Sequence, residues 1–129
     1  MIVYPKSGYN SFISTDYADT YFETRLHSAE WDAADKEQAL MTAYRSLQEL
    51  DIVIDVTDDT ALTAIKYAQC EQALHEIRHD VDGERIQAVN IAGLLSVGID
   101  TKKHPQRFSE RALNILRPYL SLKAVNRIR

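Results

Sequence analysis

The segment HEIRH, residues 75–79, follows the pattern H-E-x-x-H. On a helix this spacing places two imidazoles on one face with a carboxylate beside them, the arrangement of two ligands and a general base in zinc proteases. The pattern fixes three positions, so it is a weak signal taken alone. Its neighbours have to supply a third ligand and a closed pocket before it indicates catalysis.

The residues around this segment do not complete such a site. The extended metzincin motif would place its glycine and third ligand where this chain has Asp82 and Arg85, and Glu110 is the helical candidate for a more distant glutamate ligand. Arg78 and Asp80 bring charge to positions that are normally uncharged in the buried motif. We therefore predict ordinary surface or interface histidines and no catalytic, cofactor or metal site. An adventitious two-histidine metal face and a metallopeptidase stay open as alternatives.

A helix over about 60–80 would position these histidines. Its apolar residues gather on one side of a helical wheel, at about 100° per residue, and are Leu62, Ile65, Cys70, Ala73, Leu74 and Ile77. His75 and His79 fall on the opposite side, near Ala68 and Gln72. Cys70 lies on the apolar side, which favours a core cysteine over a nucleophile.

Three further helices are expected. One spans about 16–27, after N-cap candidates at 14–16 and with Tyr17, Tyr21, Phe22 and Leu26 at helical spacing. The second begins near 32–35 and ends near 50–51, and the third spans about 107–121. Trp31, beside the first helix, is expected to plug the core.

Short β-structure is expected between helices. The sequence DIVID, at 51–55, predicts a short strand or an extended linker, and about 84–100 predicts a β-hairpin. The fold class is therefore mainly α, a small bundle of about four helices with a hairpin between the third and fourth. Residues 1–120 are expected to form one domain, followed by a basic tail at 121–129.

Composition agrees with one globular domain. The chain has 129 residues, of which 45% are hydrophobic and 26% charged. A single cysteine cannot form an internal disulfide, which favours a reducing compartment. We see no secretory signal and no apolar run long enough to span a bilayer.

Charge is unevenly distributed along the chain. Residues 1–98 contain 7 basic and 17 acidic residues, a net charge of −10, whereas residues 99–129 contain 8 basic and 2 acidic residues, a net charge of +6. The two parts either face different partners or attract each other, within one molecule or between copies.

Two other sets of residues invite interpretation. The tyrosines Tyr17, Tyr21, Tyr44 and Tyr67 could stack nucleic-acid bases, although packing with the hydroxyl toward water or a partner is the favoured explanation. Acidic residues cluster at the expected helix starts, where capping accounts for them. They are Asp16, Asp19, Asp32, Asp35, Asp58 and Asp59.

Four stretches together resemble a family of tailed-phage head–tail connector proteins. The first, residues 10–31, has the family's opening pattern: Asn10, Ser11, Phe12, Ile13, Ser14, Ala18, Asp19, Tyr21, Phe22 and Trp31. The second and third helices follow at 36–51 and 64–77, and the closing helix at 112–120. The segment between the second and third helices is shorter here than in many relatives. Some relatives are labelled DnaT-like single-stranded-DNA-binding proteins.

The resemblance implies a structural adaptor, or head-completion protein, without catalysis or cofactors. Such proteins form a ring of twelve copies under the portal protein, extend the channel for phage double-stranded DNA and dock a stopper or tail-completion protein. Localisation would be the head–tail interface of the virion, and the host cytoplasm during assembly. We assign portal docking to the basic tail residues Lys123, Arg127 and Arg129.

Two rival functions follow from other residues. A single-stranded-DNA-binding accessory protein would use the basic segment 102–129 along a phosphate backbone, with affinity that falls steeply with salt. Another connector, such as a stopper, would be rich in β-structure.

Overall fold

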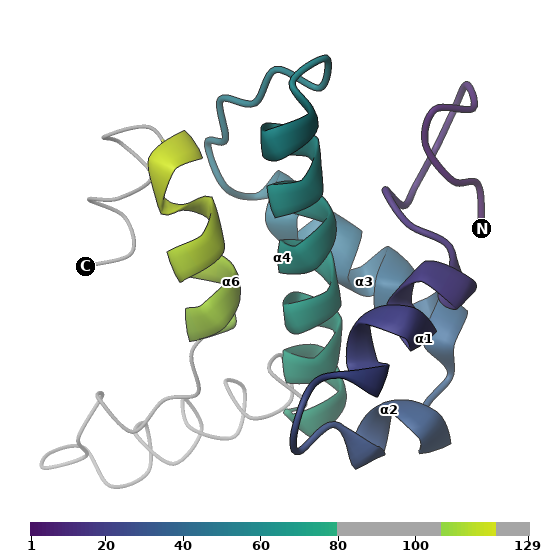
Figure 1. The fold of residues 1–129 in the computed structure, drawn as a ribbon. Helices are drawn as coiled ribbons and strands as arrows, with labels where there is room; N and C mark the ends of the chain where they lie inside the picture. Colours follow the sequence, from purple (N-terminus) through teal and green to yellow (C-terminus); the bar gives the residue numbers. More distant parts are fainter. Residues whose placement is uncertain (80–106, 121–129) are drawn as a thin grey trace, which may run out of the picture.

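The computed structural model describes residues 1–79 and 107–120. Their helices are α1 (Thr15–Glu23), α2 (Ala29–Ala33), α3 (Lys36–Gln48), α4 (Asp59–Arg78) and α6 (Glu110–Leu116), followed by the 3-10 turn η2 (Arg117–Tyr119) (Figure 1). Within these residues the β-structure consists of two isolated bridges, Val3–Ser11 and Ile52–Leu120. The mainly α class is confirmed. The expected hairpin at about 84–100 lies outside the described residues.

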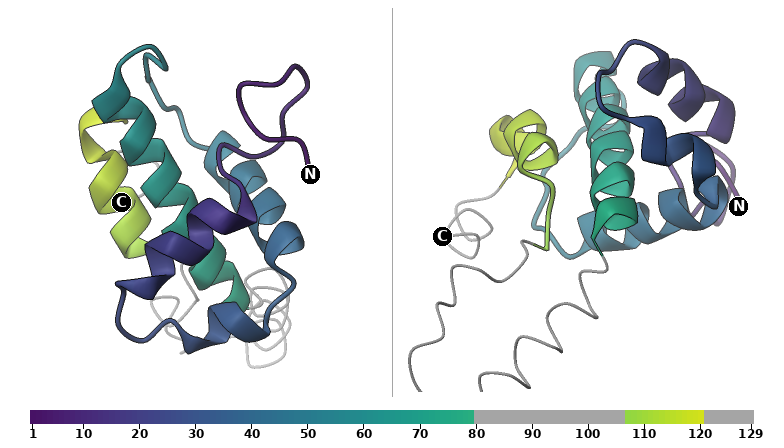
Figure 2. Two further views of the ribbon diagram at one scale, coloured as in Figure 1. Left: turned by 45° about the vertical axis from the view of Figure 1, so that its right-hand side comes forward. Right: turned by 90° about the horizontal axis from the view of Figure 1, so that it is seen from below.

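The helix α4 runs through the centre of the fold. It packs most extensively against α3 and α6, and also contacts α1 and α2. The views in Figures 1 and 2 place α6 on one side of α4 and α1 on the other. One hydrophobic cluster joins all these elements, with Leu40, Leu47, Leu74 and Leu116 almost fully buried.

Polar side chains fix where the helices begin. The side-chain oxygens of Ser14, Asp35 and Asp58 accept backbone N–H groups of α1, α3 and α4, and that of Ser109 does the same for α6. Each bond satisfies a donor that the first turn of a helix leaves without an intrahelical partner. The predicted start signals at 14–16 and near Asp35 and Asp58 are therefore confirmed.

The first predicted helix ends earlier than expected. Thr24 is the C-cap of α1, and His27 adopts a positive φ of 60°, so the chain leaves the helical path before residue 27. Leu26, expected on the apolar stripe, is 80% exposed in this turn. The chain then forms the short helix α2, which the sequence did not predict. Trp31 of α2 is 1% exposed, which confirms its place in the core.

The segment 51–55 is extended but forms no strand. Its contacts with the residues after α6 include the bridge between Ile52 and Leu120 and a 2.7 Å hydrogen bond from the Val53 N–H to the Tyr119 carbonyl. These contacts place the segment that follows α3 beside Tyr119 of η2 and Leu120. The linker alternative of the prediction therefore describes it better than a regular strand.

The helical wheel predicted a side of α4 opposite the apolar residues, and this prediction was wrong for the middle of the helix. Residues 68–74 are buried without a break, which covers every side of the helix. Ala68 and Gln72, which were placed on the exposed side, have no exposed surface. The reason is topological: α1, α2, α3 and α6 all pack against α4, so over residues 68–74 no side of the helix is left to solvent.

Candidate functional site

The HEIRH segment forms the C-terminal end of α4. The rings of His75 and His79 lie 4.8 Å apart at 42°, and Arg78 pairs with Glu30 at 2.6 Å. Glu76 accepts hydrogen bonds from Ser46 and Gln72 at 3.4 and 3.3 Å. Within residues 1–79 and 107–120 no group of three or more His, Cys, Asp and Glu side chains is placed to hold a metal ion. The described residues thus add no third ligand to the two histidines.

Three buried polar side chains of α4 anchor other parts of the chain, and Gln69 is the first. Its carbonyl oxygen accepts the Phe12 N–H at 2.9 Å, and its amide group donates to the Ser11 hydroxyl and the Leu40 carbonyl at 2.8 and 2.9 Å. Gln69 has no exposed surface. One side chain therefore fixes the N-terminal segment and α3 to α4.

The second anchor is Gln72, two residues after Cys70 and without exposed surface. Its carbonyl oxygen accepts the Ser109 N–H at 2.8 Å, and its amide donates to the Arg107 carbonyl at 3.1 Å. Both bonds reach the residues immediately before α6. Arg107 also pairs with Glu49 at the end of α3, at 2.9 Å. Together these contacts set where α6 begins against α4.

The third anchor is Glu71, which is 3% exposed. Arg25 holds it with two hydrogen bonds, of 2.8 and 3.0 Å, and the Tyr21 hydroxyl donates to the same carboxylate at 2.5 Å. Bidentate pairing and a third donor compensate for burying the charge. Burial, with the Glu71 carboxylate beside it, raises the pKa of the Tyr21 hydroxyl well above its usual value. The hydrogen bond to Glu71 raises the pKa of the Arg25 guanidinium, which stays charged.

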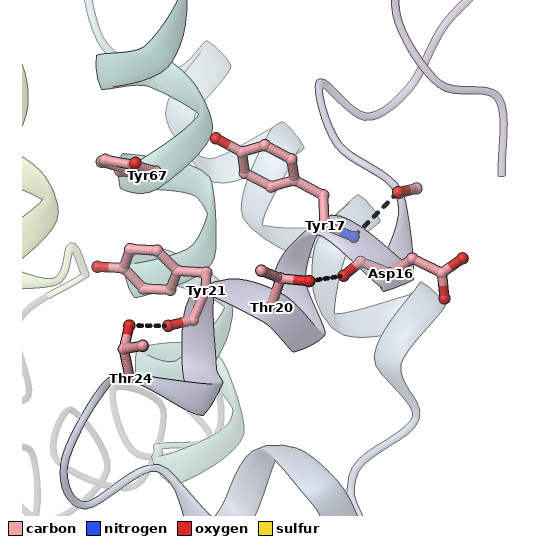
Figure 3. A pocket seen from close by; sticks show the side chains of 7 residues that line it. Asp16, Tyr17, Thr20, Tyr21, Thr24 and Tyr67 are labelled. Carbon is pink, nitrogen blue, oxygen red and sulfur yellow. Dashed lines mark hydrogen bonds between the residues drawn. The ribbon is translucent and has the colours of Figure 1, made fainter.

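A groove lies between α1 and α4, and we call it the tyrosine groove. It has a volume of about 570 Å³ and is open to solvent. Its lining residues are Ser14, Asp16, Tyr17, Thr20, Tyr21, Thr24 and Tyr67 (Figure 3). Tyr67 projects from α4 toward the two rings of α1, with its ring centre 6.5 Å from Tyr17 and 5.1 Å from Tyr21, and is 41% exposed.

One cation of the chain itself lies against the aromatic surface of the groove. Lys66 lies with its ammonium 5.4 Å from the centre of the Tyr17 ring, within the range of a cation–π contact. Burial raises the pKa of the Tyr17 hydroxyl, so this side chain is neutral at physiological pH. Tyr44, the fourth tyrosine singled out from the sequence, lies elsewhere and packs against Phe12 at 5.4 Å. The structure thus brings three of the four tyrosines together.

One acidic residue assigned to capping has another role. Asp19, in the middle of α1, accepts hydrogen bonds from the Trp31 indole and from the Lys36 ammonium, each at 2.8 Å. Phe22 packs on the Trp31 ring at 4.8 Å between centroids. The Lys36 hydrogen bond and the Trp31 hydrogen bond lower the pKa of Asp19. Asp19 thereby joins α1, α2 and the start of α3.

Sequence reasoning missed the anchoring residues Arg25, Gln69, Glu71 and Gln72. A signal was present for three of them, because they are polar and stand beside Cys70 and Ala73 in an otherwise apolar part of the helix. Their partners are 29 to 58 residues away in sequence, so no local pattern could identify them. Cys70 itself has no exposed surface and burial raises its thiol pKa, which confirms the core assignment.

The basic residues Lys123, Arg127 and Arg129 lie outside the described residues. No helix within 1–79 and 107–120 combines the length and apolar character needed to cross a bilayer.

Comparisons of the chain with protein-family models, with curated proteins and with solved structures gave no match.

Proposed function

We propose that this chain is a structural head–tail adaptor of a tailed phage, without catalytic activity. In this role twelve copies form a ring under the portal protein, lengthen the DNA channel and present a docking face to a stopper or tail-completion protein. The proposal starts from the resemblance of four stretches to the connector family. It is supported by what those residues do in the fold.

The observation that carries the proposal is the junction around Asp19 and Trp31. The opening pattern of the resemblance includes Asp19, Phe22 and Trp31, and these three form one contact set that joins α1 to α2. Ser11 and Phe12, from the same pattern, bind the buried Gln69. The shared residues are therefore those that build the helical domain, as expected if the resemblance reflects a common fold.

The charge of the body suits a channel for DNA. Residues 1–98 have a net charge of −10, and like charges discourage contacts with phosphates, so DNA would slide past such a wall without binding it. The basic segment 121–129 would instead bind the portal. In this assignment the acidic body lines the DNA channel and the basic segment binds the portal, so the two functions use surfaces of opposite charge.

The test is to mix the full-length protein with the portal ring encoded beside it and measure the mass of the product by light scattering. The proposal requires an increase by about twelve adaptor masses per portal ring. Deletion of 121–129, or replacement of Lys123, Arg127 and Arg129 by glutamine, should weaken this assembly while the circular dichroism spectrum is unchanged. A portal ring whose mass does not change contradicts the proposal.

Single-stranded-DNA binding is the alternative, and the tyrosine groove is the observation that favours it. Tyr17, Tyr21 and Tyr67 form a cluster of rings on which bases could stack, with Lys66 beside Tyr17. Fluorescence anisotropy with a labelled oligonucleotide separates the two functions. Micromolar affinity that falls steeply with salt and is lost in Tyr67→Ala would support DNA binding.

A further inference from the structure

Two exposed faces on opposite sides of α4 have complementary chemistry. The first is the tyrosine groove with the outer face of α1. The helix α1 contains no basic residue, and Asp16 lies in the groove itself with Glu23 exposed farther along the helix. Asp19 is already paired with Lys36, and Lys66 lies against the Tyr17 ring. A surface of tyrosine rings with a carboxylate beside them attracts planar cations, since a guanidinium stacks on an aromatic face while it pairs with an acid.

The second face is the outer surface of α6 and η2. Arg111 and Arg117 are both exposed there, whereas the other side of α6 buries Ala112 and Leu116 against the core. The guanidinium of Arg117 donates to the Asn114 side chain at 3.0 Å, which orients it along the helix surface. Glu110 is the one acidic residue of α6. The face therefore presents two arginines within two turns of helix.

The positions of the two faces determine how copies could meet. The helix α6 lies on one side of α4 and α1 on the other, so one molecule cannot bring its own α6 to its own groove (Figures 1 and 2). A contact between different faces of two copies leaves one free face of each kind at the ends of the pair. Such contacts continue from copy to copy and form a ring when the rotation between copies closes.

We propose that the tyrosine groove of one copy binds the α6 face of a second copy, with Arg111 and Arg117 against Tyr17, Tyr21, Tyr67 and Asp16. The attraction is weak and salt-sensitive between two free molecules, and becomes cumulative in a closed ring. This inference deepens the proposed function and rests on it for the ring. The pairwise contact itself can be tested without a portal.

The test uses two variants of the full chain that each block one face. Thr20→Arg places a cation on exposed α1 surface inside the groove, and Arg111→Glu reverses charge on α6. Sedimentation equilibrium is measured from about 10 µM to about 1 mM protein, in about 0.1 M and about 1 M salt. The wild type should associate more strongly at low salt. Each variant alone should associate at least tenfold more weakly, about 1.4 kcal/mol.

A mixture of the two variants provides the sharpest result. The Thr20→Arg molecules keep an intact α6 face and the Arg111→Glu molecules keep an intact groove, so the mixture should associate again although neither variant does so alone. This recovery also shows that both variants are folded. The matched controls are Thr42→Arg and Arg45→Glu, the same changes at exposed positions of α3, and both should associate like the wild type.

The outcomes separate this inference from the proposed function. A wild type that stays monomeric throughout, or variants that associate as the wild type does, overturns the inference. If both variants still add about twelve copies to the portal ring, the adaptor function stands and the contact assigned here is wrong. If the variants lose self-association but the wild type does not bind the portal ring, the contact stands and the adaptor function is wrong.

Discussion

The side-chain oxygen of Gln72 accepts the backbone N–H of Ser109 at 2.8 Å, and both residues are buried. The amide group of Gln72 also donates to the Arg107 carbonyl at 3.1 Å. A single side chain thus provides hydrogen-bond partners for two backbone groups that lie between α4 and the start of α6. Without Gln72 these two groups would lose those partners. This contact joins segments that are 37 residues apart in the sequence.

Replacing Gln72 by methionine should destabilise the protein although the volume is nearly conserved. The buried Ser109 N–H and the partly buried Arg107 carbonyl lose their partner, and an unsatisfied buried group costs about 1–3 kcal/mol. We expect the free energy of unfolding in urea to fall by about 2 kcal/mol or more. Hydrogen exchange of the α6 amides should also accelerate. Gln38→Met, at an exposed position of α3, is the control, and an equal loss in both variants would contradict the assigned role.

Arg25→Met should be one of the most destabilising substitutions of a charged residue. It leaves the Glu71 carboxylate, 3% exposed, without its cation, and breaking a buried ion pair in this way costs about 3–5 kcal/mol. Urea unfolding of Arg25→Met, Glu71→Gln and the double variant measures the coupling energy between the two side chains. The double variant should be more stable than Arg25→Met alone.

The loss of stability in Arg25→Met is to be compared with that in Arg78→Met, which removes an exposed ion pair. Arg78 and Glu30 form an ion pair whose side chains are 30% and 46% exposed, so water screens their attraction and removing one partner should cost little. A cost for Arg78→Met as large as that for Arg25→Met would show that burial is not what distinguishes the two pairs.

Asp19 should make stability depend on pH in the acidic range. The hydrogen bonds from Lys36 and Trp31 lower its pKa in the folded protein. Its contribution is therefore present above the unfolded-state pKa, about 3.9, and is lost as the pH falls through the lower folded-state pKa. The stability difference between the wild type and Asp19→Asn should shrink below about pH 4, as measured by urea unfolding followed through Trp31 fluorescence. A constant difference from pH 7 to the acid end of the folded range contradicts this assignment.

The thiol of Cys70 should be inert in the native protein. It has no exposed surface, and burial raises its pKa, so the reactive thiolate is absent at neutral pH. Ellman's reagent should react with it at the rate at which the fold opens, and immediately in urea. Rapid reaction of the folded protein would show that α4 opens locally around residue 70 far more easily than its burial indicates.

The sequence was sufficient to predict most of the helices. Ser14, Asp35 and Asp58 are capping residues ahead of apolar periodicity, and both signals are local. The helix α2 was missed because five residues carry no measurable period. Leu26 was misplaced because helical spacing continued beyond the point where His27 turns the chain.

The candidate site was less predictable because it depends on distant partners. Tyr17 and Tyr21 share a helix, but nothing local indicates that Tyr67 lies next to both of their rings. The wheel for α4 assumed one exposed side, which holds for a helix at the surface. A helix covered all round has buried polar positions that look exposed on such a wheel, and Gln72 was misplaced for this reason.

Burial on all sides leaves a helix without an apolar stripe to decide which way it faces. For α4 the decision falls to Gln69, Glu71 and Gln72, which point in different directions around the axis, since successive residues are about 100° apart. They bind the N-terminal segment, Arg25 and the start of α6 respectively. Rotation of the helix by one residue would break all three sets of bonds together. Polar side chains therefore fix the rotation of α4 about its own axis, which hydrophobic packing alone would leave undetermined.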